Sequence, residues 1–202
     1  MSYEVVSSRS LYQGRVLGLR VDEIRMPGGS TAVREVVENL GAVAVVALDG
    51  EGRVALVRQF RHPVRRTLWE LPAGLLDVSG EPAVEAAARE LFEETHLAAT
   101  QWDLLVDLNP SPGFTNEAVR VFLARGVSDA EGDRYAGEDD EEAEMEVTRM
   151  PLDEAVTRVL AGEVTNAIAV SGILAAAHAR NNAWKDLRPA STPWPDRPSH
   201  AD

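Results

Sequence analysis

The sequence predicts an α+β protein in which a mixed β-sheet is packed between helices. Two observations lead to this fold class. Extended segments come first, one helix interrupts them, further extended segments follow, and two helices come last, without the regular alternation of a doubly wound sheet. In addition, 202 residues with 45% hydrophobic content can build one core and a small appendage.

The N-terminal segment is predicted to form an antiparallel β-hairpin. Residues 15–26 alternate between apolar and polar side chains, the sequence PGGST then supplies a turn, and residues 32–39 are extended again. We therefore expect residues 1–40 to form a small β subdomain.

The main domain should begin with a buried hairpin at residues 41–60, where a continuous apolar run and a second strand flank the turn sequence DGEG. The first clear helix should run from about Pro82 to Thr95, because proline suits a first helical turn and alanines favour helix. Further strands are expected at 102–111, 118–126 and 147–152, and further helices at 152–163 and 166–181.

The expected strands and helices divide the rest of the chain into a main domain and a tail. Residues 41–180 should form the main domain. Residues 181–202 are expected to be a mobile tail, because they hold four of the eleven prolines and show no periodicity.

Charge and composition exclude several classes of function. The chain has no cysteine, so disulfides, thiolate zinc sites and cysteine nucleophiles are excluded. A formal net charge of -13 argues against a nucleic-acid partner. No apolar run is as long as a membrane span, and the N-terminus lacks a signal sequence, so we expect a cytoplasmic protein without a membrane partner. Residues 129–146 hold ten acids and one arginine, which composition alone attributes to a solvated loop or a disordered spacer.

Three glutamates crowd one face of the expected helix at 82–95. Glu90, Glu93 and Glu94 repel one another by roughly 0.2–0.5 kcal/mol per pair. A bound cation could offset this repulsion, and Arg89, able to pair with Glu93 and with Glu85, would orient the carboxylates. Grouped carboxylates without nitrogen or sulfur ligands favour a hard cation such as Mg²⁺ or Mn²⁺. The alternative is a solvated, glutamate-rich helix face.

The residues that flank these glutamates resemble the Nudix box, a loop-and-helix motif with fixed spacing. Between Gly74 and Leu97 the matching positions are Glu81, Arg89, Glu90, Leu91, Glu93, Glu94 and Leu97. Six residues instead of five separate Gly74 from Glu81, and His96 replaces a glycine that follows the helix in the left-handed region. The resemblance covers most of residues 30–175, and within the Nudix superfamily the chain looks most like the bacterial ADP-ribose pyrophosphatases.

The resemblance implies a Nudix fold, an α/β/α sandwich with a mixed β-sheet, that binds two or three Mg²⁺ or Mn²⁺ ions. Glu90 and Glu94 would be the main carboxylate ligands, Glu93 would assist, and the backbone carbonyl of Ala73 would complete the metal site. Glu81 would be a weaker, outer contributor.

The resemblance also implies substrate contacts. Arg34 and Arg61 would hold the phosphates or the adenine end, although a surface salt bridge is the alternative for each. Glu70 would contact the substrate as well. Phe114, in the PSPGF loop that also contains Pro112, would contact the terminal ribose, or it packs within its turn.

The same family places a catalytic glutamate on a loop after the central sheet. Glu142 is our choice for this residue, with Glu144 and Glu141 as the alternatives, because spacing does not determine the register of a loop. Together with Glu90 and Glu94 it would complete the catalytic set.

The implied function is the Mg²⁺-dependent hydrolysis of ADP-ribose to AMP and ribose 5-phosphate by a homodimer. Two alternatives stay open. The substrate could be another nucleoside diphosphate linked to a second moiety, such as a nucleotide sugar or a dinucleotide coenzyme. The chain could also be a sensor that binds ADP-ribose without cleaving it, although all the core glutamates of the motif are present.

Overall fold

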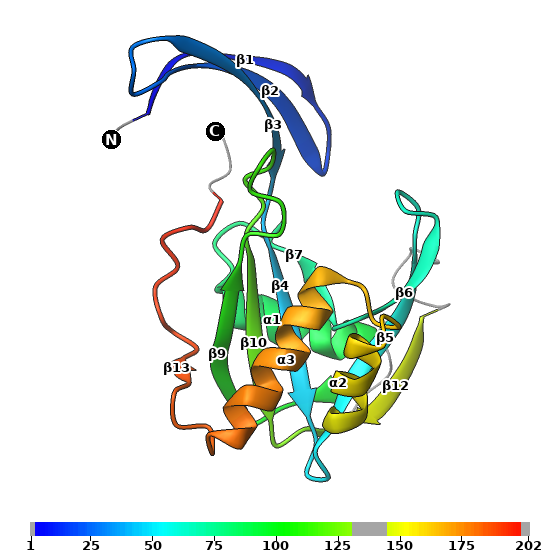
Figure 1. Ribbon diagram of the computed structural model, residues 1–202. Helices are drawn as coiled ribbons and strands as arrows, with labels where there is room; N and C mark the ends of the chain where they lie inside the picture. Colours follow the sequence, from blue (N-terminus) through cyan, green and yellow to red (C-terminus); the bar gives the residue numbers. More distant parts are fainter. Residues whose placement is uncertain (1–2, 131–144, 199–202) are drawn as a thin grey trace. The chain divides into compact units, whose positions relative to one another are not determined.

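The structure is a computed structural model that describes residues 3–130 and 145–198 (Figure 1). The chain divides into two compact units. The first comprises the described parts of residues 1–41, 109–118 and 195–202, and the second comprises the described parts of residues 42–108 and 119–194. The sequence did not predict that residues 109–118 would join the N-terminal unit.

The first unit contains a three-stranded antiparallel sheet in the order β1 (Glu4–Gln13), β2 (Leu17–Arg25) and β3 (Thr31–Asn39). The β2–β3 hairpin is the one expected from the sequence. The sequence analysis did not find β1, because its side chains do not alternate cleanly between apolar and polar. All ten residues of β1 are exposed.

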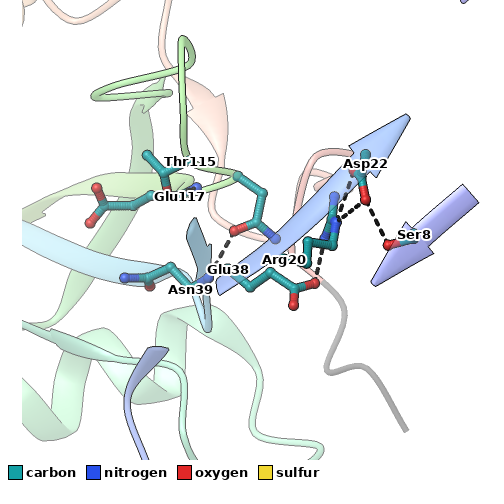
Figure 2. A network of polar contacts seen from close by, with 8 residues as sticks. Ser8, Arg20, Asp22, Glu38, Asn39, Thr115 and Glu117 are labelled. Carbon is teal, nitrogen blue, oxygen red and sulfur yellow. Dashed lines mark hydrogen bonds and ion pairs between the residues drawn. The ribbon is translucent and has the colours of Figure 1, made fainter. Parts of the chain in front are cut away.

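A polar network ties these three strands together (Figure 2). The hydroxyl of Ser8 on β1 donates a hydrogen bond of 2.6 Å to Asp22 on β2. Nε of Arg20 lies 3.1 and 3.0 Å from the two carboxylate oxygens of Asp22, and the same guanidinium pairs with Glu38 on β3. The hydrogen bond from Ser8, aided by Arg20, holds the pKa of Asp22 below its ordinary value although burial opposes this.

Backbone hydrogen bonds explain why residues 109–118 belong to the first unit. The N–H of Val37 donates to the carbonyl of Phe114 at 2.8 Å, and the N–H of Asn116 donates to the carbonyl of Val37 at 3.3 Å. The side-chain oxygen of Asn116 also accepts from the N–H of Asn39 at 2.8 Å. The loop therefore pairs with β3 along the edge that β2 leaves open.

The second unit is built on a mixed sheet in the order β12-β5-β4-β10-β9-β13. Its strands are β4 (Ala42–Leu48), β5 (Arg53–Arg61), β6 (Arg66–Glu70), β7 (Ala73–Leu75), β9 (Gln101–Leu108), β10 (Val119–Arg125), β12 (Glu146–Pro151) and β13 (Arg188–Pro189). A separate pair consists of β8 (Leu97–Ala98) and β11 (Ser128–Asp129). All seven residues of β4 are buried, as its continuous apolar run predicts, and β4 runs parallel to β10.

The hairpin predicted for residues 41–60 is paired only next to its turn, where Leu48 is opposite Val54. Beyond this point β5 pairs with β6, and β7 pairs with the start of β4. The separation of β4 from β5 leaves room for β7 to pair with the start of β4.

Three helices cover the two faces of this sheet, which confirms the predicted α/β/α sandwich (Figure 1). Val43, Val45 and Ala47 pack with α1 (Ala83–Thr95) on one face. The alternate residues of β4 pack on the other face with α3 (Ala167–Asn181), which lies beside α2 (Leu152–Leu160). Within the described residues, none of the helices combines the length and the apolar character that crossing a membrane requires.

The proline-rich segment after α3 makes specific contacts, although its composition led us to expect a mobile tail. β13 pairs with β9. The buried guanidinium of Arg120 donates to the carbonyls of Thr192 and Pro193 at 2.7 and 3.2 Å and lies 4.7 Å from the ring centroid of Trp194. Carbonyl acceptors and a flat indole can bind an arginine without any periodic pattern, so the sequence alone did not reveal these contacts.

Candidate active site

The helix α1 has the ends that the sequence predicts. Pro82 precedes it with φ of -61°. His96 follows it with φ of 58°, in the left-handed region, and donates its N–H to the carbonyl of Phe92. The structure thus confirms that His96 takes the conformation in which the Nudix box has glycine.

The guanidinium of Arg89 lies among the glutamates of α1 and of the loop before it. It hydrogen-bonds both carboxylate oxygens of Glu81 at 3.2 Å, Oε1 of Glu90 at 2.7 Å and Oε2 of Glu93 at 2.9 Å. The predicted pair with Glu93 is present, whereas Glu81 and Glu90 are the other partners in place of Glu85. These contacts raise the pKa of Arg89, and the hydrogen bond to Glu81 makes the largest contribution. One fixed positive charge therefore offsets the repulsion among three carboxylates.

Glu90 occupies space that only a glycine at position 74 leaves open. A Cβ added to Gly74 would lie 2.0 Å from Cδ of Glu90. The side chain of Glu90 is only 13% exposed, and burial is the main reason why its pKa is raised to about 6. The charges of Glu93 and Asp77 raise this pKa further, and Arg89 opposes them. Asp77, a carboxylate three residues after Gly74, was not among the predicted site residues.

Glu94 joins α1 to the strand before the motif. Its carboxylate is largely buried, at 8% exposure, and accepts the N–H of Ala73 at 3.0 Å. Ala73 lies on β7 opposite Ala44 of β4. The structure therefore brings Glu94 to Ala73 and Glu90 to Gly74 on β7, whereas Glu93 contacts Arg89.

These residues fit a hard divalent cation by their chemistry. In the part of the chain that the structure describes, no three His, Asp or Glu side chains are already arranged around a common metal position. The donors are nonetheless carboxylates, which Mg²⁺ and Mn²⁺ prefer. Since Gly74 has no side chain, the carboxylate of Glu90 can sit directly against β7. Release from Arg89 would free Glu90 and Glu93 as ligands.

Arg61 and Glu70, both predicted to contact substrate, are bound to each other. Arg61 on β5 donates from Nε and Nη2 to the two carboxylate oxygens of Glu70 on β6, at 2.9 and 2.8 Å. Glu70 is almost fully buried at 4% exposure, whereas the Arg61 side chain is 43% exposed. The buried carboxylate holds one edge of the guanidinium and so orients it.

The other predicted residues belong to the first unit or lie outside the described residues. Arg34 and Phe114 belong to the first unit. Arg34 is exposed and donates to the carbonyl of Val33 at 2.9 Å, and Phe114 is 57% exposed. The proposed catalytic residue Glu142 and its alternatives Glu141 and Glu144 lie outside the described residues.

Comparison with known proteins identifies related sequences over nearly the whole chain. The NUDIX domain model matches residues 38–168, and the model of the nucleoside diphosphate sugar hydrolase N-terminal domain matches residues 3–37. An ADP-ribose pyrophosphatase of Mycobacterium tuberculosis is 49% identical over 98% of this chain and 93% of its own length. An ADP-ribose pyrophosphatase of Bacillus subtilis is 39% identical over 81% of this chain and 86% of its own length.

A solved structure shares the fold. The crystal structure of an ADP compounds hydrolase superimposes with a TM-score of 0.75 and covers 91% of this chain and 96% of its own, at 19% sequence identity. The mixed sheet and its flanking helices are therefore an arrangement that is also found in an experimental structure.

Proposed function

The chain belongs to the NUDIX domain family, and from this premise we propose that it hydrolyses the pyrophosphate bond of ADP-ribose, giving AMP and ribose 5-phosphate. The observation that carries the proposal is the cluster of Glu90, Glu93 and Glu94 on α1 beside Ala73 and Gly74. The near full-length similarity to an ADP-ribose pyrophosphatase supports the choice of substrate.

A pyrophosphate group carries dense negative charge, which repels an attacking hydroxide. Mg²⁺ or Mn²⁺, when bound, would neutralise this charge and lower the pKa of a bound water. Glu90, Glu93 and Glu94 would hold the ions, in agreement with their burial and their position beside β7. Two or three ions per site is the number that we propose.

The protein's own residues have separate tasks in this proposal. Arg89 keeps the carboxylates of Glu81, Glu90 and Glu93 together before substrate arrives. Arg61, oriented by its two hydrogen bonds to Glu70, is proposed to contact a substrate phosphate. Arg34 and Phe114 are proposed to contact the remaining parts of the substrate. Glu142 is proposed to accept the proton of the attacking water.

Product analysis tests this function directly. The protein is incubated with ADP-ribose and Mg²⁺, and the products are separated by chromatography and identified by ³¹P NMR. We expect AMP and ribose 5-phosphate in equal amounts, and no reaction in the presence of a chelator. Intact ADP-ribose after prolonged incubation with Mg²⁺ and with Mn²⁺ would refute the proposal and favour a sensor that binds without cleavage.

A second candidate differs in substrate and keeps the chemistry. Residues 3–37 match a domain that is named for hydrolases of nucleoside diphosphate sugars. A panel of ADP-ribose, nucleotide sugars and dinucleotide coenzymes, compared by kcat/KM, separates the two candidates. ADP-ribose should have the highest value, and a nucleotide sugar with a higher value would replace it as the substrate.

We also propose that the protein is a homodimer. All ten residues of β1 are exposed, and Val5, Leu11 and Tyr12 on this strand have 59%, 46% and 59% exposure. Exposed apolar side chains on a sheet support association with another chain. Light scattering coupled to size exclusion should give twice the monomer mass of 21.9 kDa. Replacing Val5 and Leu11 by charged residues should lower the measured mass to that of a monomer.

The remaining expectations about partners and place stay predictions. The acidic net charge of -13 supports the absence of a nucleic-acid partner. A location in the cytoplasm is our further proposal, and cell fractionation with an antibody against the protein would test it.

A further inference from the structure

A cavity of about 300 Å³ lies within the second unit, away from the carboxylates of α1. It is lined by the β4–β5 turn, the end of β10, the start of α2, Arg180 near the end of α3, and Trp184 beyond that helix. Arg125 at this cavity is aligned with Leu48, the last residue of β4, whereas Gly74 is aligned with Val43 near its start. Five residues at about 3.3 Å each separate the two places by on the order of 16 Å.

Two arginines, Arg125 and Arg180, line this cavity. Arg125 donates from Nη2 to Asp103 at 2.8 Å, but its buried Nε–H has no hydrogen-bond partner among the described residues. Arg180 also lines the cavity and is paired at 2.5 Å with Asp153, whose side chain is 80% exposed. An exposed ion pair of this kind is worth little, so Arg180 can exchange Asp153 for an incoming anion.

Asp49, the one carboxylate among the lining residues, is already paired with an arginine. Asp49 accepts the N–H groups of Glu51 and Arg53 at 2.9 and 3.0 Å, and its other oxygen pairs with Nε of Arg53 at 2.8 Å. These contacts hold the pKa of Asp49 below its ordinary value although its burial opposes this. Asp49 therefore stays ionised but has its charge compensated by Arg53, and it does little to repel an anion.

An indole ring forms another wall, and the backbone that carries it is strained. Ala183 and Trp184 both lie in the left-handed region, with φ of 54° and 63°. The N–H of Trp184 donates to the carbonyl of Ala179 at 2.8 Å, and the ring centroid lies 5.2 Å from Cζ of Arg125. Consecutive non-glycine residues in this region are costly and are found preferentially at functional sites. Here they place an aromatic surface beside the two arginines.

We propose that this cavity is a second ligand site that binds a phosphate monoester. Guanidinium groups match the geometry of a phosphate, and the indole with Leu48 and Leu152 supplies a surface for an organic body. The volume lies at the lower end of the range for small-molecule sites, which is about 300–1,000 Å³. The choice of ligand rests on the proposed function, because both products of ADP-ribose hydrolysis are phosphate monoesters. The site would thus sense product far from the carboxylates of α1.

Calorimetric titration of the metal-free protein tests this site separately from hydrolysis. AMP, ribose 5-phosphate, inorganic phosphate and adenosine are titrated in turn. AMP should bind most tightly, and adenosine should not bind, because it lacks the phosphate. Arg180→Gln should weaken AMP binding about tenfold. Trp184→Gly should weaken it too, and since glycine accepts a positive φ, this variant removes the ring without adding backbone strain.

Two control variants test whether AMP binds at this cavity or at α1. Arg158→Gln removes another arginine of the second unit, paired with Glu154 on α2, which does not line the cavity, so AMP binding should be unchanged. Glu94→Gln should also leave AMP binding unchanged. Binding that is lost with Glu94→Gln but kept with Arg180→Gln would place the ligand at α1 and overturn the proposal. Equal binding of adenosine and AMP, or no binding of AMP, would overturn it as well, whether or not ADP-ribose is hydrolysed.

Discussion

The carboxyl group of Glu90 lies where a side chain at position 74 would otherwise be. A Cβ on Gly74 would approach Cδ of Glu90 to 2.0 Å and its two oxygens to 2.2 and 2.4 Å. Such distances are far below any real contact between these atoms. Glu90 can therefore hold its position only because residue 74 on β7 has no side chain. Gly74 and Glu90 together form one feature of the site.

Gly74→Ala should disrupt the site without unfolding the protein. The added methyl group must displace the carboxylate of Glu90, so we expect kcat with ADP-ribose to fall at least tenfold and the Mg²⁺ requirement to rise. Steady-state kinetics at several Mg²⁺ concentrations measure both. Gly28→Ala is the matched control, because its Cβ would meet nothing within 4 Å. Unchanged kinetics of Gly74→Ala would show that Glu90 has no fixed role.

Glu90→Gln and Glu94→Gln should each lower kcat by orders of magnitude and leave the fold intact. Each change removes a charge that a cation needs, while the amide keeps the size of the side chain. The metal-free Glu90→Gln protein should be slightly more stable, because this carboxylate is buried among other negative charges. Glu85→Gln, an exposed glutamate in the first turn of the same helix, is the control and should be near wild type. If all three variants turn over alike, α1 does not bind the catalytic ions.

His96→Gly should stabilise the protein by about 1 kcal/mol, because glycine relieves the left-handed strain at φ of 58°. Activity should change little. His96→Ala separates strain from side-chain contact, since alanine keeps the strain but loses the ring that lies 5.2 Å from the ring of Phe92. Thermal unfolding of the three proteins gives the comparison. A lower midpoint for the glycine variant would mean that the histidine ring contributes more than the strain costs.

Ser8→Ala should destabilise the protein near neutral pH but not in acid. The hydrogen bond from Ser8 is the main reason why the pKa of Asp22 is lowered. A carboxyl group with a lowered pKa adds stability above its unfolded value of 3.8, and this stability is lost as the pH falls through the folded pKa. We expect a loss of about 1 kcal/mol at pH 7 from denaturant unfolding, shrinking as Asp22 becomes protonated.

Ser10→Ala, on the same exposed strand, is the control for this experiment and should show no such dependence on pH. A loss of stability for Ser8→Ala that is the same in acid and at pH 7 would mean that the hydroxyl does not act through the charge of Asp22.

Glu142→Gln should lower kcat strongly and leave Mg²⁺ affinity and ADP-ribose binding nearly unchanged, which is the pattern of a group that acts in the transition state. The joint replacement of Glu138, Asp139 and Asp140 by their amides should cost much less. Steady-state kinetics measure kcat, and separate titrations measure the binding of Mg²⁺ and of ADP-ribose. Similar losses from both sets would attribute the acidic run to bulk charge, and a silent Glu142→Gln would direct attention to Glu144.

Elements and motifs whose physical cause is local could be predicted from the amino-acid sequence. The capacity of α1 to form follows from its alanines and from Pro82, and its end follows from the position of His96. The buried strand β4 follows from a continuous apolar run. The spacing of Glu90, Glu93 and Glu94 on one helix face is likewise a property of helix geometry, so the amino-acid sequence is enough to name the candidate metal ligands.

Contacts between residues that are distant in the sequence could not be predicted in this way. Arg61 and Glu70 meet because β5 and β6 pair, and Arg89 turns to Glu81 because the loop before α1 folds back onto the helix. The exposed strand β1 and the contacts of Arg120 with Thr192 have no periodic pattern that could reveal them. Such contacts depend on how strands are ordered and where loops close, and the free energy of these long-range choices does not follow from any local stretch of sequence.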